Sequence, residues 1–353
     1  MKKVLKEVAG IDVAQKELVV SLGRLYEDLD IETIGYRVFQ NTDSGINDLI
    51  HWAAKKSIHP VRVSYVMEAT GVYHEKLAYG LYGHGLNLSI VLPNKISNFF
   101  RTLQINTVTD RTASQAIMRF GLERKLEHWE PPKSVFRELK QLTRERDQIV
   151  DQRSVAKNQL HAEKKQALPN QRSLDRITER INLLNIQEKE IRMDIAQLLK
   201  QYPEVKERVD NICTIPGVGM LTAAIVLVET NGFELIRNKK QLTGYAGLDV
   251  REKQSGTSIK GKPRISKKGN RHLRKSMHLP SLSSIKYNHS HKSFYQRIVA
   301  KSGIKMKALI AVQRKTLELI YVTDKNATTY QDGCTQKRTL CANAQSILLQ
   351  TGS

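Results

Sequence analysis

The chain has 353 residues, 40% of them hydrophobic and 26% charged, a composition typical of a globular protein with about two domains. Lys and Arg number 57 against 35 Asp and Glu, so the formal net charge is +22. Such an excess repels itself unless a polyanion neutralises it, which favours nucleic acid as the partner. No apolar run reaches the ~20 residues of a membrane span, no signal-peptide core is present, and three scattered cysteines indicate neither disulfides nor a zinc site. We therefore expect a reducing, cytoplasmic location.

Residues 1–130 have the pattern of an α/β domain. Apolar or alternating runs predict strands at 8–13, 18–22, 36–39, 61–67 and 88–92. Between and after them, helices are expected at 45–55, 74–81 and about 110–124. Two consecutive prolines, Pro131 and Pro132, interrupt this pattern and mark the expected end of the domain.

Residues 131–202 carry two apolar stripes with heptad spacing, one on each side of a turn at Pro169 and Asn170, and predict an antiparallel helical hairpin. The stripes contain Val135, Leu139, Leu142, Ile149, Ala156 and Leu160, then Leu174, Ile177, Ile181, Leu184, Ile191, Ile195 and Leu198. Two interpretations stay open: a helix pair packed within its own domain, or a coiled coil that joins two copies. The polar stripe members Arg146, Arg153 and Glu188 favour the dimerising coiled coil, because polar seam residues select partners.

Residues 203–325 predict a mainly helical third domain, and residues 326–353 a polar tail without periodicity. Helices are expected at 221–227, 270–277 and 305–321. Ten basic residues and the single acid Glu252 lie between Arg251 and Lys275. We interpret this segment as a phosphate-binding surface rather than a solvated loop, because so few acids are interspersed. The contact residues expected in it are Lys260, Lys262, Arg264, Lys267, Lys268, Arg271, Arg274 and Lys275.

A glycine motif, Ile215-Pro216-Gly217-Val218-Gly219, precedes the apolar helix expected at 221–227. Gly217 and Gly219 would let backbone N–H groups at the helix N-terminus approach a phosphate. A plain turn before a buried helix explains the motif equally well.

Three acids are placed as in a metal-dependent nuclease. Asp12 lies inside an apolar strand, Glu68 ends another, and Asp110 opens a helix after Thr109. Carboxylates at strand ends and on an adjacent helix can hold two divalent cations for phosphodiester cleavage, and Mg²⁺ suits oxygen ligands. Taken singly, each acid is explained as a helix cap, a solvated strand end or a hydrogen-bonded bend. The three in this order, in a basic chain, favour a nuclease-type site.

The same residues carry a family resemblance. G-I-D-V-A at 10–14, M-E-A-T-G-V-Y at 67–73, V-L-P at 91–93 and T-D-R at 109–111 resemble the N-terminal domain of the DEDD insertion-sequence transposases. That group includes the Piv/MooV DNA invertases and the bridge-RNA-guided recombinases. The resemblance implies a RuvC-like domain of ribonuclease-H fold, followed by the family's coiled coil and its second domain, over about residues 8–322.

One position departs from the family pattern. The helix acid is normally followed three residues later by another acid, but here Ala113 follows Asp110. Positions i and i+3 share a helix face, so a fourth carboxylate is missing where it would point at the metals. Ser114 and Gln115 are candidates for a water-mediated contact in its place, although neither supplies a charge.

The C-terminal part resembles the family's second domain. Gln254-Ser255-Gly256, Gly261, Ile265-Ser266-Lys267-Lys268-Gly269-Asn270 and Leu273-Arg274 match its S-G…G…I-x-K-x-G-N-x-x-L-R pattern. By that resemblance Ser255 is the catalytic nucleophile, whereas the residues alone would favour a turn serine. Ser266 is the rival nucleophile. His272 and His278 are candidate bases, although a basic-surface contact is the plainer interpretation of each.

The function implied is a DNA recombinase or transposase that cuts and rejoins strands through a phosphoserine intermediate. It would use about two Mg²⁺ ions, a structured guide RNA with donor and target DNA, and protomers joined by the coiled coil, as a dimer and then a tetramer in the active complex. We expect the protein in the bacterial cytoplasm, associated with the nucleoid. Two alternatives remain: a RuvC-like metal nuclease that hydrolyses branched DNA, and a degenerate, non-catalytic nucleic-acid-binding protein, which Ala113 favours.

Overall fold

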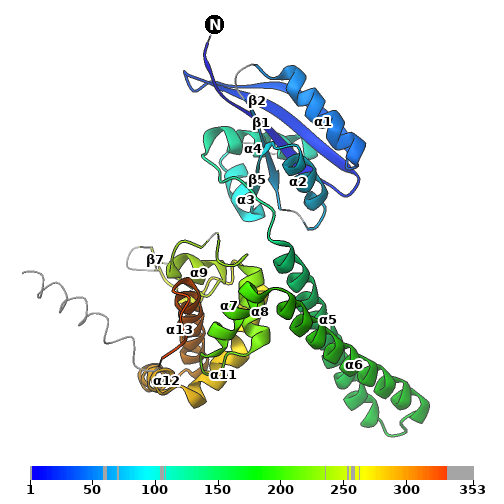
Figure 1. Ribbon diagram of the computed structural model, residues 1–353, viewed down its shortest axis with the longest axis vertical. Helices are drawn as coiled ribbons and strands as arrows, with labels where there is room; N and C mark the ends of the chain where they lie inside the picture. The colour runs from blue at the N-terminus through cyan, green and yellow to red at the C-terminus, as the bar shows by residue number, and fades with distance from the viewer. Residues whose placement is uncertain are drawn as a thin grey trace, which may run out of the picture. The chain divides into compact units, whose positions relative to one another are not determined.

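The computed structural model describes residues 2–58, 62–69, 71–103, 107, 109–234, 236–252, 254–255, 259–261 and 263–331, with only the backbone at 254–255 and 259–260. These residues form two compact units, Met1–Pro131 and Pro132–Ser353, each described here by itself (Figure 1). The expected domain boundary at residue 130 lies beside this division. The helical hairpin and the C-terminal helices, expected as separate domains, share the second unit. No described helix is long and apolar enough to cross a membrane.

The first unit is built on a mixed five-stranded sheet of order β3-β2-β1-β4-β5. Its strands are β1 (Val4–Val13), β2 (Glu17–Tyr26), β3 (Ile31–Gln40), β4 (Val63–Glu68) and β5 (Asn87–Val91). The first three strands pair antiparallel, whereas β4 and β5 continue parallel to β1. The five strands expected from the sequence are all present, and the first three are longer than their apolar runs.

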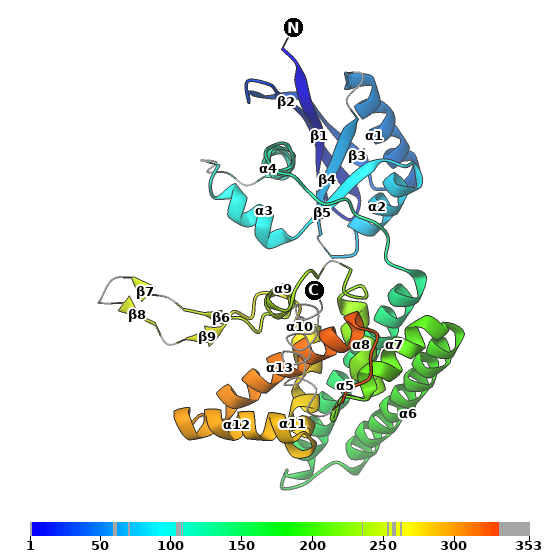
Figure 2. The same ribbon diagram turned by 60° about the vertical axis from the view of Figure 1, so that its left-hand side comes forward.

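Helices cover both faces of this sheet. The helices α1 (Asp43–Lys56) and α2 (His74–Gly83) lie on one face, and α3 (Pro93–Phe100) and α4 (Asp110–Glu123) lie on the other (Figure 2). Alternate residues of a strand point to opposite faces. Accordingly Ile11 of β1 packs in the core beneath α1 and α2, whereas Val8 packs with Ile117 of α4.

Two glycines allow α4 to lie directly on the sheet. A Cβ atom on Gly10 of β1 would be 2.1 Å from the backbone nitrogen of Met118, and one on Gly121 would be 2.7 Å from a methyl carbon of Val8. The matched pairs show that α4 runs antiparallel to β1: Gly121 lies at Val8, and Met118 lies at Gly10. The N-terminus of α4 is therefore at the end of β1 that carries Asp12.

The second unit begins with the expected hairpin of α5 (Ser134–Lys164) and α6 (Gln171–Gln201), which pack against each other. Stripe residues such as Ile181 and Leu184 are buried within this chain. The polar stripe residues also find partners here, because Arg146 and Arg192 each donate to Glu188 at 2.8 Å and Arg153 forms an ion pair with it. Burial raises the pKa of the Glu188 carboxyl, but the three arginines outweigh it and lower the pKa to about 2. Polarity in the seam therefore has an explanation within one chain.

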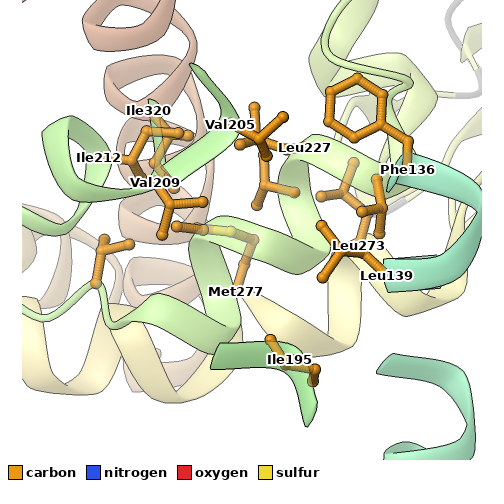
Figure 3. Packing of buried hydrophobic residues seen from close by; sticks show 14 of the residues in the cluster. Phe136, Leu139, Ile195, Val205, Val209, Ile212, Leu227, Leu273, Met277 and Ile320 are labelled. Atoms are coloured by element: carbon orange, nitrogen blue, oxygen red, sulfur yellow. The ribbon is translucent and has the colours of Figure 1, made fainter. Parts of the chain in front are cut away.

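The remaining helices enclose the main core of the second unit. They are α7 (Pro203–Cys213), α8 (Met220–Glu229), α9 (Lys239–Tyr245), α10 (Arg271–Ser276), α11 (His278–Tyr287), α12 (His289–Ser302) and α13 (Lys305–Lys325). Apolar α8 runs through this core, where Leu227 meets Leu139 of α5 and Leu273 of α10 (Figure 3). The hairpin thus packs into the same core as the C-terminal helices.

Candidate active site

Asp12 and Glu68 lie side by side on neighbouring strands. In the parallel pair β1–β4, Ile11 is in register with Met67, so the next residues are Asp12 and Glu68. Gly10 and Val66 pack against α4, and each acid follows one of them by two residues, which puts it on the same face of the sheet. Both acid side chains are half-buried. They therefore lie on the α4 face.

Asp110 joins them from the helix. It is the first residue of α4, whose N-terminus is fixed by a capping box: Thr109 accepts from the Thr112 N–H at 3.2 Å and donates its own N–H to the Thr112 hydroxyl at 2.8 Å. A carboxylate in the first turn is stabilised by the positive end of the helix dipole. Because α4 runs antiparallel to β1, its first turn lies at the Asp12 end of the strand.

The charge of Asp110 affects the pKa of Asp12, and the charge of Asp12 affects the pKa of Glu68. Burial raises the pKa of Asp12, the negative charge of Asp110 raises it further, and a backbone hydrogen bond at Val13 opposes both. Burial also raises the pKa of Glu68, with a second contribution from the charge of Asp12. Asp12 is therefore the acid through which the other two are coupled.

The three carboxylates suit a hard cation, but they are not gathered around one point. Three carboxylates supply only oxygen ligands, and their mutual repulsion is what a divalent cation would relieve. Within the described residues, no three His, Cys, Asp or Glu side chains are gathered closely enough to form a metal centre. The acids are thus coupled in pairs rather than closed into one cluster.

The missing fourth carboxylate has no substitute in Ser114. Its side chain is fully buried, bonded to the Ser21 hydroxyl at 2.8 Å and donating to the Arg111 carbonyl at 2.9 Å. The suggestion that Ser114 makes a water-mediated metal contact is therefore wrong, because the hydroxyl is used beneath the helix. Ala113 is half-buried, and Gln115 lines a groove beside α4.

Ser255 lies in an antiparallel β arm, of which residues 250–252, 254–255, 259–261 and 263–265 are described. The strands β6 (Val250–Arg251) and β9 (Arg264–Ile265) form the base of this arm, and β7 (Gln254–Ser255) pairs with β8 (Ile259–Lys260) beyond it. Figure 2 shows both ladders extending from the helices. Ser255 is the last residue of its strand, in register with Ile259. Its assignment as the nucleophile stays a prediction.

Ser266, the rival nucleophile, fastens the base of the arm. Its hydroxyl hydrogen-bonds to the carboxylate of Asp249 and accepts from the Lys268 N–H at 3.3 Å, while its own N–H donates to the Asp249 carbonyl at 2.8 Å. These bonds fit a structural role for Ser266.

The expected phosphate-binding residues differ in their surroundings. Arg264, Lys267, Lys268 and Arg271 are exposed, and none of them forms an ion pair with another described residue. Arg274 donates to the Ala246 carbonyl at 2.8 Å, and Lys275 pairs with Asp151 of α5 at 2.8 Å. For Lys260 only the backbone is described, and Lys262 lies outside the described residues, as does the tail from residue 332. The exposed four are the strongest candidates for phosphate contact.

The two glycines of the motif before α8 have different surroundings. Gly217 has φ +92° in the left-handed region, and a Cβ atom there would lie 2.7 Å from both the Pro280 carbonyl oxygen and the Ser284 nitrogen. Close packing against α11 therefore accounts for Gly217. Gly219 is the exposed N-cap of α8 and has open space beside it, so a phosphate contact there stays a prediction.

His272 faces a carboxylate, the usual partner of a catalytic base, but only at the limit of hydrogen-bond distance, and His278 faces an amide. The His272 ring nitrogen lies 3.5 Å from an Asp147 carboxylate oxygen on α5, and that of His278 lies 3.2 Å from the Gln313 amide. His272 thereby links α10 to α5, and His278 links α11 to α13.

Glu229 was missed by sequence reasoning. It is 3% exposed, and its carboxylate accepts from Arg144 of α5 at 3.0 Å and from the Asn270 amide at 2.6 Å. Asn270 caps α10, and the Tyr245 hydroxyl donates to the Glu229 carbonyl at 2.8 Å. An acid at the end of the apolar helix was the only available signal. Glu229 connects the base of the arm to α5.

Comparisons with known proteins agree over both units. A model of the DEDD IS110-type family described as "Transposase" matches residues 9–169, and one described as "Transposase IS116/IS110/IS902 family" matches residues 209–296. Pilin gene-inverting proteins of Moraxella bovis and Moraxella lacunata are each 29% identical over 287 residues, 80% of this chain and 86% of theirs. A 43.6 kDa protein of insertion element IS110 from Streptomyces coelicolor is 29% identical over 120 residues, 34% of this chain and 29% of its own.

Among solved structures, the chain is similar to "T. thermophilus RuvC in complex with Holliday junction substrate", at 11% identity and a TM-score of 0.24, over 33% of this chain and 97% of that one. The family matches cover the acids in the first unit and the serine arm in the second. The chain belongs to the IS110-type transposases and recombinases, a family of DNA-rearranging enzymes.

Proposed function

We propose that the protein is the recombinase of an insertion sequence, which cuts and rejoins DNA through a covalent phosphoserine at Ser255. The observation that carries the proposal is the position of the acids: Asp12 and Glu68 lie side by side on β1 and β4, at the end of the sheet where Asp110 begins α4. A ribonuclease-H-like assignment of the first unit is supported by its mixed sheet, which brings two strand acids under a helix N-terminus.

The acids form the metal-binding half of the proposed site. Asp12, Glu68 and Asp110 would hold Mg²⁺, two ions by the family resemblance, and the bound metal would stabilise negative charge on the scissile phosphate. Asp12 is half-buried, and burial and the charge of Asp110 both raise its pKa, so its charged form is unfavourable without a cation. Asp12→Asn should therefore abolish strand exchange and leave nucleic-acid affinity nearly unchanged.

The arm supplies the nucleophile. The Ser255 oxygen forms a bond to phosphorus as the bond from phosphorus to the leaving deoxyribose oxygen breaks; the serine loses its proton, and the leaving oxygen gains one. Attack by the hydroxyl of another strand reverses these steps and restores the serine. The exposed cations Lys267, Lys268 and Arg271 beside the arm would balance the charge of the transition state.

Assembly and guidance complete the proposal. By resemblance, a structured RNA chooses donor and target DNA by base pairing, which suits a chain of charge +22. The α5–α6 hairpin would join protomers into a dimer and then a tetramer, so that the metal unit of one meets the arm of another. The seam between α5 and α6 is occupied within one chain, so this contact would use outer surfaces of the hairpin.

A degenerate, non-catalytic protein is the alternative with a specific observation behind it. Ala113 replaces the family's fourth acid, and the described residues include no closed metal cluster. A hydrolytic nuclease acting on branched DNA would need the acids but not Ser255.

One experiment separates the three. The protein is incubated with DNA carrying the element's ends, its flanking RNA and Mg²⁺, and denaturing gels are examined for protein–DNA adducts. An adduct that persists in Ser266→Ala and disappears in Ser255→Ala and in excess chelator supports the proposal. Cleavage without any adduct would favour the nuclease, and binding without cleavage the degenerate protein. Recombination by Ser255→Ala, or an adduct mapped to Ser266, would reject the assigned nucleophile.

A further inference from the structure

Among the residues that the structure describes, the edge strand β3 has exposed side chains on the face that carries the acids. Ser21 of β2, bonded to Ser114 of α4, is in register with Tyr36, so Tyr36 lies on the α4 face. Tyr36 and its alternate neighbour Val38 are 40% and 43% exposed. The register also runs from Asp12 through Val19 to Val38, which places this bare surface two strands from the acids, about 10 Å away.

Arg111 is held over this surface. It follows Asp110 in α4, and its guanidinium carbon lies 4.8 Å from the centroid of the Tyr36 ring. Its side chain is exposed and forms no ion pair in the part of the chain that the structure describes. Stacking on an aromatic face restricts the guanidinium and keeps its donors available, an arrangement suited to binding phosphate. Three acids lie nearby, yet Arg111 is directed to β3.

A groove also lies between β3 and α4, further along both elements from Tyr36 and Arg111. It has a volume of about 460 Å³ and is lined by Ile31 and Thr33 at the start of β3 and by Gln115, Met118 and Arg119 of α4, among others. The two elements run antiparallel, since Tyr36 meets Arg111 while Ile31 and Thr33 share the groove with residues near Arg119. Asp30 also lines the groove, but Lys2 pairs with it at 2.6 Å.

We propose that one strand of the DNA substrate lies along this seam, and that Arg111, stacked on Tyr36, binds a phosphate adjacent to the one at the acids. The inference rests on the proposed function, because it takes the acids as the cleavage point. The cation without an ion pair, the exposed aromatic surface and the groove all lie along β3 and α4, and α4 begins at Asp110. These features supply the sugar-phosphate contacts that fix the register of the strand at the acids.

Binding without chemistry tests this proposal independently of the nucleophile. Full-length Ser255→Ala protein is titrated in Ca²⁺ with a fluorescein-labelled DNA duplex carrying the element's end, over a range of salt concentrations. Arg111→Ala should weaken binding about tenfold, the usual effect of one lost charged hydrogen bond. It should also reduce the salt slope by about 1. Arg111→Lys should restore the slope and only part of the affinity.

Arg37→Ala is the matched control. Arg37 follows Tyr36 in β3 and is exposed, and its guanidinium carbon lies 5.1 Å from the centroid of the Phe39 ring. It is on the opposite face of the sheet from Tyr36. Equal losses of affinity and slope for Arg111→Ala and Arg37→Ala would reject the proposal. Photo-crosslinking from p-benzoylphenylalanine at position 36 should label DNA, whereas the same group at exposed Tyr82 on α2 should not. Labelling of the guide RNA alone at position 36 would also overturn it.

Discussion

The buried carboxylate of Glu188 offers a quantitative test of how the α5–α6 hairpin is held together. Glu188 is 6% exposed and is bound by three arginines, which lower its pKa from 4.5 to about 2. One pKa unit corresponds to about 1.36 kcal/mol, so the ionised form gains about 3 kcal/mol on folding. Glu188→Gln should lose a comparable amount at pH 7 and lower the midpoint of thermal unfolding of the second unit by about 6–12 °C.

The sign of the pH dependence follows from the lowered pKa. The stabilisation by Glu188 is complete above its unfolded pKa of 4.5 and is lost as the pH falls toward about 2. The difference in unfolding free energy between the native chain and Glu188→Gln should therefore be about 3 kcal/mol at pH 7 and shrink steadily between pH 4.5 and 2. Calorimetry or urea unfolding across this range measures it.

A neighbouring glutamate supplies the control. Glu190 is on the same helix, exposed and without an ion pair among the described residues. Glu190→Gln should change the unfolding free energy by less than about 0.5 kcal/mol at any pH. Equal losses in the two variants, or a Glu188→Gln deficit that stays constant down to pH 2, would refute the reasoning.

Three further predictions concern assembly and chemistry. Replacing Ile181 and Leu184 together by Asp should unfold the hairpin rather than only separate protomers, because both side chains are buried within the chain; circular dichroism and light scattering distinguish a monomer that stays folded, which would contradict this. Ala113→Asp should lower the Mg²⁺ concentration needed for half-maximal strand exchange, since it restores a carboxylate on the acid-bearing face, and an unchanged metal titration would mean that three acids suffice. Glu229→Gln should reduce strand exchange more than DNA affinity, with an unfolding cost of about 2 kcal/mol; equal losses of both would assign Glu229 to DNA binding.

The strands and the acids could be predicted because short-range patterns determine them. Apolar or alternating runs located the strands, and the acids stood out as charged residues within or at the end of such runs. The sequence did not predict the parallel pairing of β1 with β4, which sets Asp12 beside Glu68. The helix α3 was missed because Pro93 was taken as the end of a strand, whereas proline at the first helical position needs no N–H donor.

Other features depend on contacts that are distant in sequence. The two ladders of the arm pair residues through only two positions each, too short for any periodicity. Glu229 is meaningful only because Arg144 and Asn270 meet it, from 85 and 41 residues away. The heptad stripes predicted the hairpin, but could not show whether its seam is filled by the same chain. Ser255 came from the family resemblance, and no local pattern singled it out.

The contact between Gly10 and α4 sets the distance between Asp12 and Asp110. Asp12 is two residues from Gly10, and Asp110 is eight residues from Met118, so one helix resting on one bare stretch of backbone determines how far apart the two carboxylates lie. A Cβ atom needs more than 3.0 Å from its neighbours, yet only 2.1 Å is available at Gly10. A single methyl group there would lift the helix by about an ångström, a displacement large enough to disturb catalytic geometry. The spacing of the acids therefore depends on the absence of a Cβ atom at residue 10.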